Sequence, residues 1–443
     1  MVTFLLGVLA LECLVMLGWG MLRRARMIEF PFLASAVFFG WVLPQLIGLT
    51  NHRFLPTGGL EKTILMAILC LAAAWWGYRR NRRPARLFRW HLSPSRLLWG
   101  STVTSLVGAF FFYQMSQIGP EAGTQWSGII TIYAFFASSL AAGTAIVLIL
   151  FLHRPSWTTA LLLGFDLMFY LHRIIMSGRR TAMVELGLML LMALWFRRRW
   201  LPPRWAMVAA LFLGTLVINS IGDYRTTVIR ADQPGWSGAG IGDIMAIDYF
   251  GNLRNLISGR AGSPELTNAV MNIEGVDRQM KFDFGFSYWN ALIQRYVPGQ
   301  FIGADRKQAL MIDFAGIDPV STSAVTEFGF IPVTGSTPTG LSDSFQSFWY
   351  FGAMIFYIIG LVMSRWYRAA IRGNVIAQIT VLLIVTPSLH AITHSTHWFF
   401  VYFVQLAAFL LPVVFLARIR KPLKPTSDTP RVALAYRRFP GQA

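Results

Sequence analysis

Long apolar runs alternate with short polar segments along most of the chain. The runs are about 20 residues long, the length that an α-helix needs to cross a hydrocarbon core about 30 Å thick. Because lipid offers backbone amides no hydrogen-bond partners, runs of this kind must be helical. The pattern therefore predicts an all-α fold, a polytopic transmembrane helical bundle of about eleven spans. Their expected positions are 3–22, 28–50, 60–78, 97–118, 129–152, 158–176, 181–197, 205–222, 346–364, 375–395 and 398–417.

One long polar segment interrupts this pattern. Residues 223–345 are rich in glycine, aspartate, asparagine and proline, and the segment is far longer than an ordinary connection. Within it, apolar side chains recur at helical spacing from Ile241 to Leu256 and from Trp289 to Val297. Both stretches are typical of amphipathic helices that lie on the membrane or on the bundle. The expected organisation is an N-terminal transmembrane bundle of about eight spans at 1–222, a partly helical extracytoplasmic loop region at 223–345, about three C-terminal spans at 346–417 and a basic cytoplasmic tail at 418–443.

The composition supports a membrane protein, and the placement of charge orients it. Of the 443 residues, 55% are hydrophobic and 13% are charged, about half the charged fraction of a soluble domain. The net charge is +19, but the basic residues cluster at the ends of apolar runs. That placement marks cytoplasmic loops and not a nucleic-acid surface. About 25 basic residues fall in these clusters, against about five in short segments on the other side. The asymmetry predicts an N-terminus outside the cytoplasm and a C-terminus within it.

Several signatures of nucleotide-dependent or hydrolytic enzymes are missing from the sequence. It contains no Walker A pattern, no Gly-x-Gly-x-x-Gly after a strand and no Gly-x-Ser-x-Gly, which disfavours nucleotide-driven chemistry. The two cysteines, Cys13 and Cys70, both lie in apolar runs. We therefore expect buried thiols and no disulfide framework.

The sharpest local signal is the pair Arg179 and Arg180, in the short segment 177–181 that joins two apolar runs. Arginine at the mouth of a membrane bundle is costly unless it is paired or functional. A guanidinium fork binds a phosphate through two parallel hydrogen bonds. The alternative is interfacial snorkelling, or an ion pair with an acid on a flanking helix such as Asp166 or Glu185. Because both arginines face the side opposite the positive-inside bias, the pattern favours a binding function.

The polar segment adds further arginines but is acidic as a whole. From Asp223 to Asp343 it holds nine basic and 13 acidic residues, so it cannot trap anions in general. A diphosphate would have to be held by a few placed side chains. Arg225, directly after a span, and Arg295, in the second amphipathic stretch, are the best placed.

Three histidines form a second polar group near the outer end of a span. His390, His394 and His397 lie at i, i+4 and i+7, which predicts one helical face. Two of them could bind zinc as a helical pair, but no convincing third ligand is spaced nearby. Substrate hydrogen bonding, proton transfer and interhelical bonding are the other roles open to them. Asp166, in the middle of a span, fits a helix–helix partner better than a catalyst.

Four motifs follow one another between 177 and about 360. They are Ser177-Gly178-Arg179-Arg180-Thr181, Phe284-Gly285-Phe286-Ser287-Tyr288, Gln294-Arg295-Tyr296-Val297-Pro298 with Asp305-Arg306-Lys307 downstream, and Thr339-Gly340-Leu341-Ser342-Asp343-Ser344-Phe345 leading to Phe351-Gly352. In this order, and within this topology, they resemble the Wzy-type O-antigen or oligosaccharide repeat-unit polymerases. The chain departs from the family's Pro-Arg pair, since Arg295 precedes Pro298 by three residues.

The resemblance implies a glycosyltransferase of the bacterial inner membrane. Such an enzyme joins undecaprenyl-diphosphate-linked oligosaccharide units into O-antigen, capsule or exopolysaccharide on the periplasmic side. It implies no cofactor, no nucleotide sugar and no obligatory metal. The expected partners are the lipid-linked oligosaccharide, membrane lipids, and flippase and chain-length regulator proteins, with no nucleic acid. In this reading Arg179, Arg180, Arg225 and Arg295 bind the substrate diphosphate, and Asp343 or His394 accepts the proton of the acceptor hydroxyl.

Rival functions remain open at this stage. An O-antigen ligase uses the same donor with a lipid A-core acceptor, but ligases carry a histidine where this chain has Leu341-Ser342-Asp343. A lipid-oligosaccharide transporter or flippase is a rival from another class, although transporters are often built from repeats and this sequence shows none. A membrane acyltransferase with an intramembrane histidine, His390 or His394, is the third.

Overall fold

The computed structural model describes residues 1–52, 54–80, 84–85, 90–118, 129–176, 178–228, 241–260, 265–312, 322–331 and 337–419. Side chains are described for these residues except 225–228, 241, 322–323 and 326. Within this part of the chain every regular element is helical, which confirms the all-α prediction. The only other pairing is an isolated antiparallel bridge between Leu92 and Arg418.

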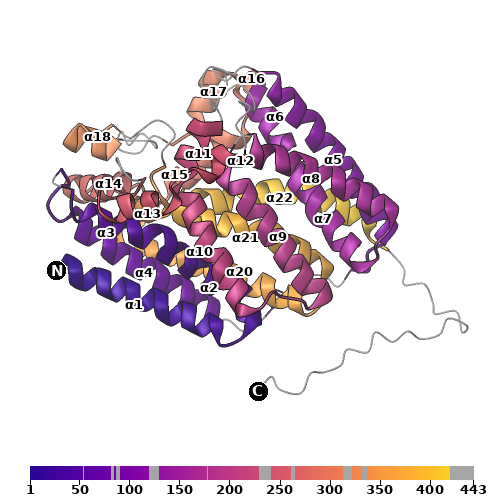
Figure 1. Cartoon of the computed structure of the whole chain (residues 1–443). Helices are drawn as coiled ribbons and strands as arrows, with labels where there is room; N and C mark the ends of the chain where they lie inside the picture. Colours follow the sequence, from indigo (N-terminus) through magenta and orange to yellow (C-terminus); the bar gives the residue numbers. More distant parts are fainter. Residues whose placement is uncertain are drawn as a thin grey trace, which may run out of the picture.

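The first part of the chain forms the outer and central helices of the bundle (Figure 1). These are α1 (Val2–Met21), a 3-10 turn at Arg24–Ile28, α2 (Phe30–Val37), a π turn at Phe38–Val42, α3 (Leu43–Leu49), α4 (Gly59–Arg80), α5 (Pro94–Ser116), α6 (Ile129–Ala137), α7 (Ser139–His153), α8 (Trp157–Ile175), α9 (Arg180–Arg198) and α10 (Arg204–Asn219).

Shorter helices follow, and three long ones close the bundle. The short ones are α11 (Ile221–Val228), α12 (Ile241–Met245), α13 (Tyr249–Ile257), α14 (Glu265–Gln279), α15 (Phe286–Tyr296), α16 (Gly299–Ile302), α17 (Ala304–Ala309) and α18 (Thr322–Phe328). Then come α19 (Gly340–Phe348), a 3-10 turn at Trp349–Gly352, α20 (Ala353–Ile371), α21 (Val375–Thr393) and α22 (Thr396–Ala417).

Eight helices of the described chain are long and apolar enough to cross a membrane. They are Val2–Met21, Phe30–Leu49, Gly59–Arg80, Ile129–His153, Trp157–Ile175, Gly340–Ile371, Val375–Thr393 and Thr396–Ala417. Each falls on an expected span. The other three expected spans are also helical: α10 is shorter than these eight, whereas α5 and α9 are long enough but less apolar or more charged. A helical membrane bundle is thus confirmed, while eleven crossings stay a prediction.

The bundle is built around α21, which is buried along most of its length, whereas α1 and α8 expose most of their surface. Next to it, α4 and α20 approach closely through small residues. A Cβ atom on Gly77 would lie 2.1 Å from the carbonyl oxygen of Tyr357, and one on Gly360 would lie 2.2 Å from that of Ala74. Inside a membrane the hydrophobic effect does not drive helices together, so van der Waals packing at close backbone contacts of this kind supplies much of the attraction.

The described residues between 223 and 345 form short helices at one end of the bundle, seen at the upper left of Figure 1. The helix expected from 241 to 256 is two helices, α12 and α13, because Asp248 ends the first run and caps the second by accepting the Gly251 N–H at 2.8 Å. The helix expected near 289–297 is confirmed as α15. Nothing in the sequence analysis predicted α14, whose buried face (Leu266, Val270, Ile273) packs on α3 and α4.

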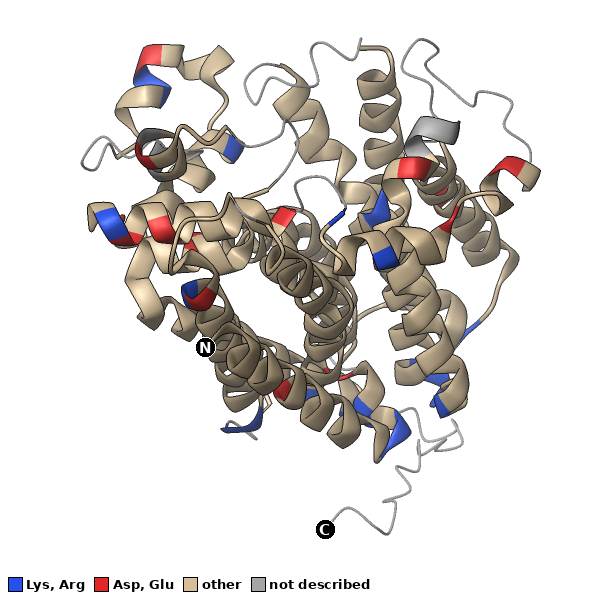
Figure 2. Cartoon of the chain, turned by 60° about the vertical axis from the view of Figure 1, so that its left-hand side comes forward, with Lys and Arg blue, Asp and Glu red and all other residues tan. Residues whose placement is uncertain are grey.

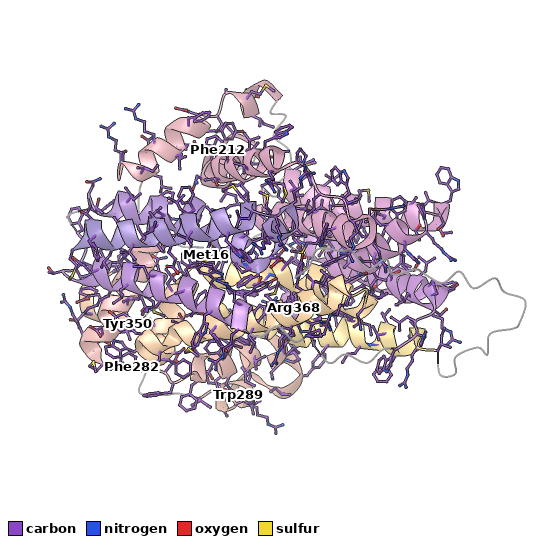
Figure 3. The ribbon with its side chains drawn as sticks, turned by 90° about the horizontal axis from the view of Figure 1, so that it is seen from below. Met16, Phe212, Phe282, Trp289, Tyr350 and Arg368 are labelled. Carbon is purple, nitrogen blue, oxygen red and sulfur yellow. The ribbon has the colours of Figure 1, made fainter. Side chains whose placement is uncertain are left out.

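Charge and burial divide the molecule as a membrane protein requires. Figure 2 shows most acidic residues at the upper end, and a group of lysines and arginines at the lower end near the C-terminal tail. In Figure 3, Met16 of α1 lies among neighbouring helices, whereas Phe212 of α10 lies at the periphery. Cys13 and Cys70 are buried free thiols, as expected.

Candidate functional site

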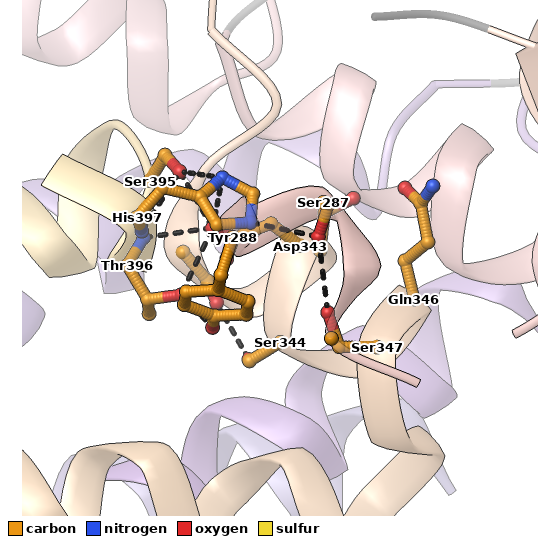
Figure 4. A network of polar contacts seen from close by, with 12 residues as sticks. Ser287, Tyr288, Asp343, Ser344, Gln346, Ser347, Ser395, Thr396 and His397 are labelled. Carbon is orange, nitrogen blue, oxygen red and sulfur yellow. Dashed lines mark hydrogen bonds and ion pairs between the residues drawn. The ribbon is translucent and has the colours of Figure 1, made fainter. Parts of the chain in front are cut away.

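The candidate site is organised by the junction between α21 and α22. The helix stops at Thr393, His394 is its C-cap, and Ser395 is extended before α22 begins at Thr396. The single helical face expected for the three histidines is therefore wrong. The rings of His390 and His394 lie 4.9 Å apart, but His397 lies beyond the break and faces other residues (Figure 4). In the described chain no three His, Cys, Asp or Glu side chains converge as a metal site.

Asp343 of α19 is buried against this junction. Its Oδ2 accepts hydrogen bonds from the Ser395 hydroxyl at 2.6 Å, the Thr396 backbone N–H at 2.7 Å and the Thr396 hydroxyl at 2.9 Å. The carboxylate thus caps the first turn of α22 from another helix, where the helix dipole favours a negative charge. Its other oxygen, Oδ1, is buried and has no hydrogen-bond partner among the described residues.

His397 connects this carboxylate to the loop region. Its Nδ1 lies 2.8 Å from Ser395 Oγ and 3.5 Å from Asp343 Oδ2. On the other side of the ring, Nε2 lies 2.9 Å from the hydroxyl oxygen of Ser287 in α15. The ring also packs edge-on against Tyr288, with centroids 4.2 Å apart. Together with Thr396, these side chains form one polar network between α15, α19 and α22 (Figure 4).

The backbone before α15 places Ser287 and Tyr288 in this network. Gly285 has a positive φ of 87°, and a Cβ there would lie 3.0 Å from the Phe348 ring, so glycine fits the position for two reasons. Its N–H donates to the Asp283 carboxylate at 2.8 Å, which shapes the turn that starts the helix. Burial, with the charge of Asp343, raises the pKa of the Tyr288 hydroxyl well above its usual range. Tyr288 therefore stays protonated and hydrogen-bonds the Thr396 hydroxyl.

The arginine pair occupies the start of α9. Arg179 is exposed at the N-cap, and Arg180 forms an ion pair with Glu265 at the start of α14, with 3.0 Å between nitrogen and oxygen. Both partners of that pair are partly exposed. Asp166 and Glu185, the two acids that the sequence suggested as partners, do not pair with Arg180. Asp166 instead accepts a hydrogen bond from Ser105 of α5 at 3.1 Å, the helix–helix role predicted for it, and Glu185 interacts with Arg173.

His394 lies close enough to this ion pair for both of its charges to act on the histidine pKa. Burial lowers its pKa, the Glu265 carboxylate acts in the opposite direction, and the Arg180 guanidinium lowers it further. A neutral imidazole at physiological pH can accept a proton or a hydrogen bond. The Thr393 hydroxyl lies 2.8 Å from its Nδ1.

Of the two arginines predicted in the polar segment, the structure describes the side chain of Arg295 but not that of Arg225. The Arg295 guanidinium lies over the Trp398 ring, 4.1 Å from its centroid, a cation–π contact. Burial lowers the pKa of Arg295, but a guanidinium keeps its charge at any physiological pH. Arg225 lies in α11, and its side chain is outside the described part of the structure.

Of the six predicted site residues, His394 belongs to one short segment, 393–398, and three others meet that segment: Arg180, Arg295 and Asp343. Sequence reasoning missed Glu265, Ser287 and Ser395, and weighed His397 only together with its two neighbouring histidines. Ser287 did lie in one of the quoted motifs, which was the available signal. Comparison with protein-family models, with curated proteins and with solved structures gives no match.

Proposed function

We propose that the chain is a polyprenyl-diphosphate-dependent glycosyltransferase. It polymerises undecaprenyl-diphosphate-linked oligosaccharide repeat units into a surface polysaccharide at the periplasmic face of the bacterial inner membrane. The observation that carries the proposal is the convergence of two arginines, a buried carboxylate and a neutral histidine around 393–398. These are the groups that transfer from a diphosphate donor to a hydroxyl acceptor requires.

In this proposal the arginines stabilise the negative charge that develops on the diphosphate. Negative charge grows on the diphosphate as its bond to the sugar breaks, so cations fixed beforehand stabilise the transition state more than the ground state. The partly exposed Arg180–Glu265 pair opens to exchange one acidic partner for another, and Arg179 adjoins it. The Arg295 guanidinium lies over the Trp398 ring and so meets the same segment. Arg225 completes the set proposed for the diphosphate.

The proposal is tested by polymer length in a strain that lacks the gene. Wild-type protein should restore long polymer, and Arg180→Ala at normal protein level should leave single repeat units. Losing one such donor typically costs about 3–4 kcal/mol, or roughly 10²–10³ in rate. Arg180→Lys keeps the charge without the fork and should give shortened polymer. Arg254→Ala, at an exposed arginine of α13, is the matched control and should support full-length polymer.

The same strain separates the rivals. A missing ligase leaves long polymer on its undecaprenyl carrier, and a missing flippase leaves single repeat units on the cytoplasmic face. A missing polymerase leaves single units that still reach the periplasm. Full-length polymer in the strain without the gene would reject the proposed function.

A further inference from the structure

The hydrogen-bond directions around His397 follow from Asp343. Its Oδ2 accepts from the Thr396 backbone N–H and lies 2.6 Å from Ser395 Oγ, so the Ser395 proton must point at the carboxylate. The Ser395 hydroxyl has only this one proton, so it can only accept a hydrogen bond from the His397 ring. Nδ1 of His397, 2.8 Å from Ser395 Oγ, must therefore carry a hydrogen. In a neutral imidazole the other nitrogen, Nε2, then has a free lone pair.

That lone pair meets a hydroxyl group. Nε2 lies 2.9 Å from Ser287 Oγ, and because Nε2 can only accept, the Ser287 proton points at the ring. Ser347 Oγ, 3.5 Å away, then donates to Ser287, which keeps one oxygen lone pair for a further donor. A hydroxyl on a base, with the base oriented by a third group, is the arrangement that activates hydroxyl groups in enzymes. The residues come from three separate helices, α15, α19 and α22.

The place of this cluster in the molecule also suits a reaction. The side chain of His397 retains 19% of its exposure, against 6% for Asp343, and Ser287 beside the ring is buried, so the cluster is least buried at His397. The next residue, Trp398, carries the Arg295 guanidinium on its ring. On the other side of the junction, His394 lies by Arg180 and Glu265. The base thus belongs to the same short segment, 393–398, that Arg180 and Arg295 meet, and these are two of the four arginines proposed for the diphosphate.

We propose that His397 is the general base of the transfer, that Ser287 passes it the proton of the acceptor hydroxyl, and that Asp343 and Ser395 position the ring. This rests on the proposed function. His397 takes the role that the sequence suggested for Asp343 or His394. Its ring is held by hydrogen bonds at both nitrogens. Asp343 becomes a positioning residue whose negative charge stabilises the imidazolium formed.

The acceptor hydroxyl gives its proton to Ser287 Oγ while the Ser287 proton moves to His397 Nε2. The acceptor oxygen forms a bond to the anomeric carbon of the donor sugar. The bond between that carbon and the diphosphate oxygen breaks, and its electron pair leaves on the diphosphate. The proton on the imidazolium then passes to the diphosphate or to water, which restores the neutral ring.

The test uses full-length protein in lipid nanodiscs with the lipid-linked repeat unit that accumulates in the strain without the gene. His397→Asn keeps a donor toward Ser395, and His397→Gln keeps a polar group toward Ser287, but neither is a base. Both should slow single-turnover polymer formation about 100-fold or more, the lower end of the usual contribution of a general base. Both should bind undecaprenyl diphosphate as wild type does, which shows that they are folded. Near-normal rates in either variant would overturn the proposal.

Further variants separate proton transfer from a structural role. Added imidazole should restore part of the rate of His397→Gly, since it can supply the missing base but not a missing helix contact. Ser287→Thr should keep most of the rate and Ser287→Ala should lose about ten-fold or more. Ser388→Ala removes a buried serine of α21 that bonds only its own helix, at Val385, and should behave as wild type.

Two outcomes distinguish this inference from the proposed function. If His394→Asn abolishes transfer and His397→Asn does not, His394 is the base and the inference is wrong, although the chain remains a polymerase. If wild-type protein in nanodiscs makes no polymer and binds no undecaprenyl diphosphate, the proposed function fails and the inference fails with it.

Discussion

A single carboxylate, Asp343, links three helices. It belongs to α19, caps α22 through Thr396 and reaches α15 through His397 and Ser287. Hydrogen bonds to a charged group are worth about 1.5–3 kcal/mol each, more than neutral ones. The hydrogen bonds of Asp343 that stabilise the junction between α21 and α22 also orient the His397 imidazole. Asp343 therefore contributes both to stability and to the proposed reaction.

We expect Asp343→Asn to lower both. An amide oxygen has no charge to offer the first turn of α22, and the amide NH2 group cannot accept from Ser395. The free energy of unfolding should fall by about 1.5–3 kcal/mol, measured as a lower thermal midpoint in detergent. Asp305→Asn, at an exposed acid in the first turn of α17, should leave the midpoint within a degree or two. An equal shift in both variants would contradict the capping role of Asp343.

His394 should make stability depend on pH. Its pKa in the folded protein is lowered, whereas an exposed histidine has a pKa of about 6.5. The unfolded state therefore binds more protons below this value, and stability falls as the pH drops from about 6.5 toward the folded pKa. His394→Gln cannot titrate, so its thermal midpoint should fall less than that of wild type between pH 7 and pH 5. Identical pH dependence in the two proteins would exclude a contribution from His394.

At the scale of elements, the contact between α4 and α20 depends on the absence of side chains. Gly360 meets the backbone of α4 at Ala74, and Gly77 meets the backbone of α20 at Tyr357. Backbone cannot move aside as a flexible side chain can. The pair therefore fixes how closely these two central helices approach.

We expect Gly360→Val to force α4 and α20 apart. Inserting side-chain atoms into a packed contact typically costs about 1–3 kcal/mol, visible as a lower thermal midpoint and a smaller yield of monodisperse protein. Gly164→Val on α8 is the matched control, because a Cβ at Gly164 meets nothing within 4 Å. If both variants were equally stable, close approach would not be what holds the two helices together.

At the scale of the whole molecule, the two ends of the bundle differ in charge (Figure 2). The positive-inside rule then predicts the orientation. Reporter fusions after Arg89, Arg199 and Lys421 should report the cytoplasm, and fusions near Ser263 and Ser323 should report the periplasm. A cytoplasmic signal from either of the last two would place residues 223–345 on the wrong side for a periplasmic polymerase.

The sequence by itself determined the class of this protein and the position of its long helices. In lipid the backbone has almost no alternative to the helix, so each apolar run specifies its own structure without help from distant residues. The same local logic located α15, and it predicted arginines that lie beside the site. It failed at 390–397, where a regular spacing suggested one helix and Ser395 instead caps a new one.

The tertiary structure alone decided which polar groups meet. Arg180 and Glu265 are 85 residues apart in the chain, and Ser287 and His397 are 110 apart. No periodicity records such pairs, because they depend on how whole helices pack and where each one stops. The register between α15, α19 and α22 is fixed by many side-chain contacts summed over the bundle. As a result of this packing, His397 faces Ser287 and Asp343 and not the two neighbouring histidines.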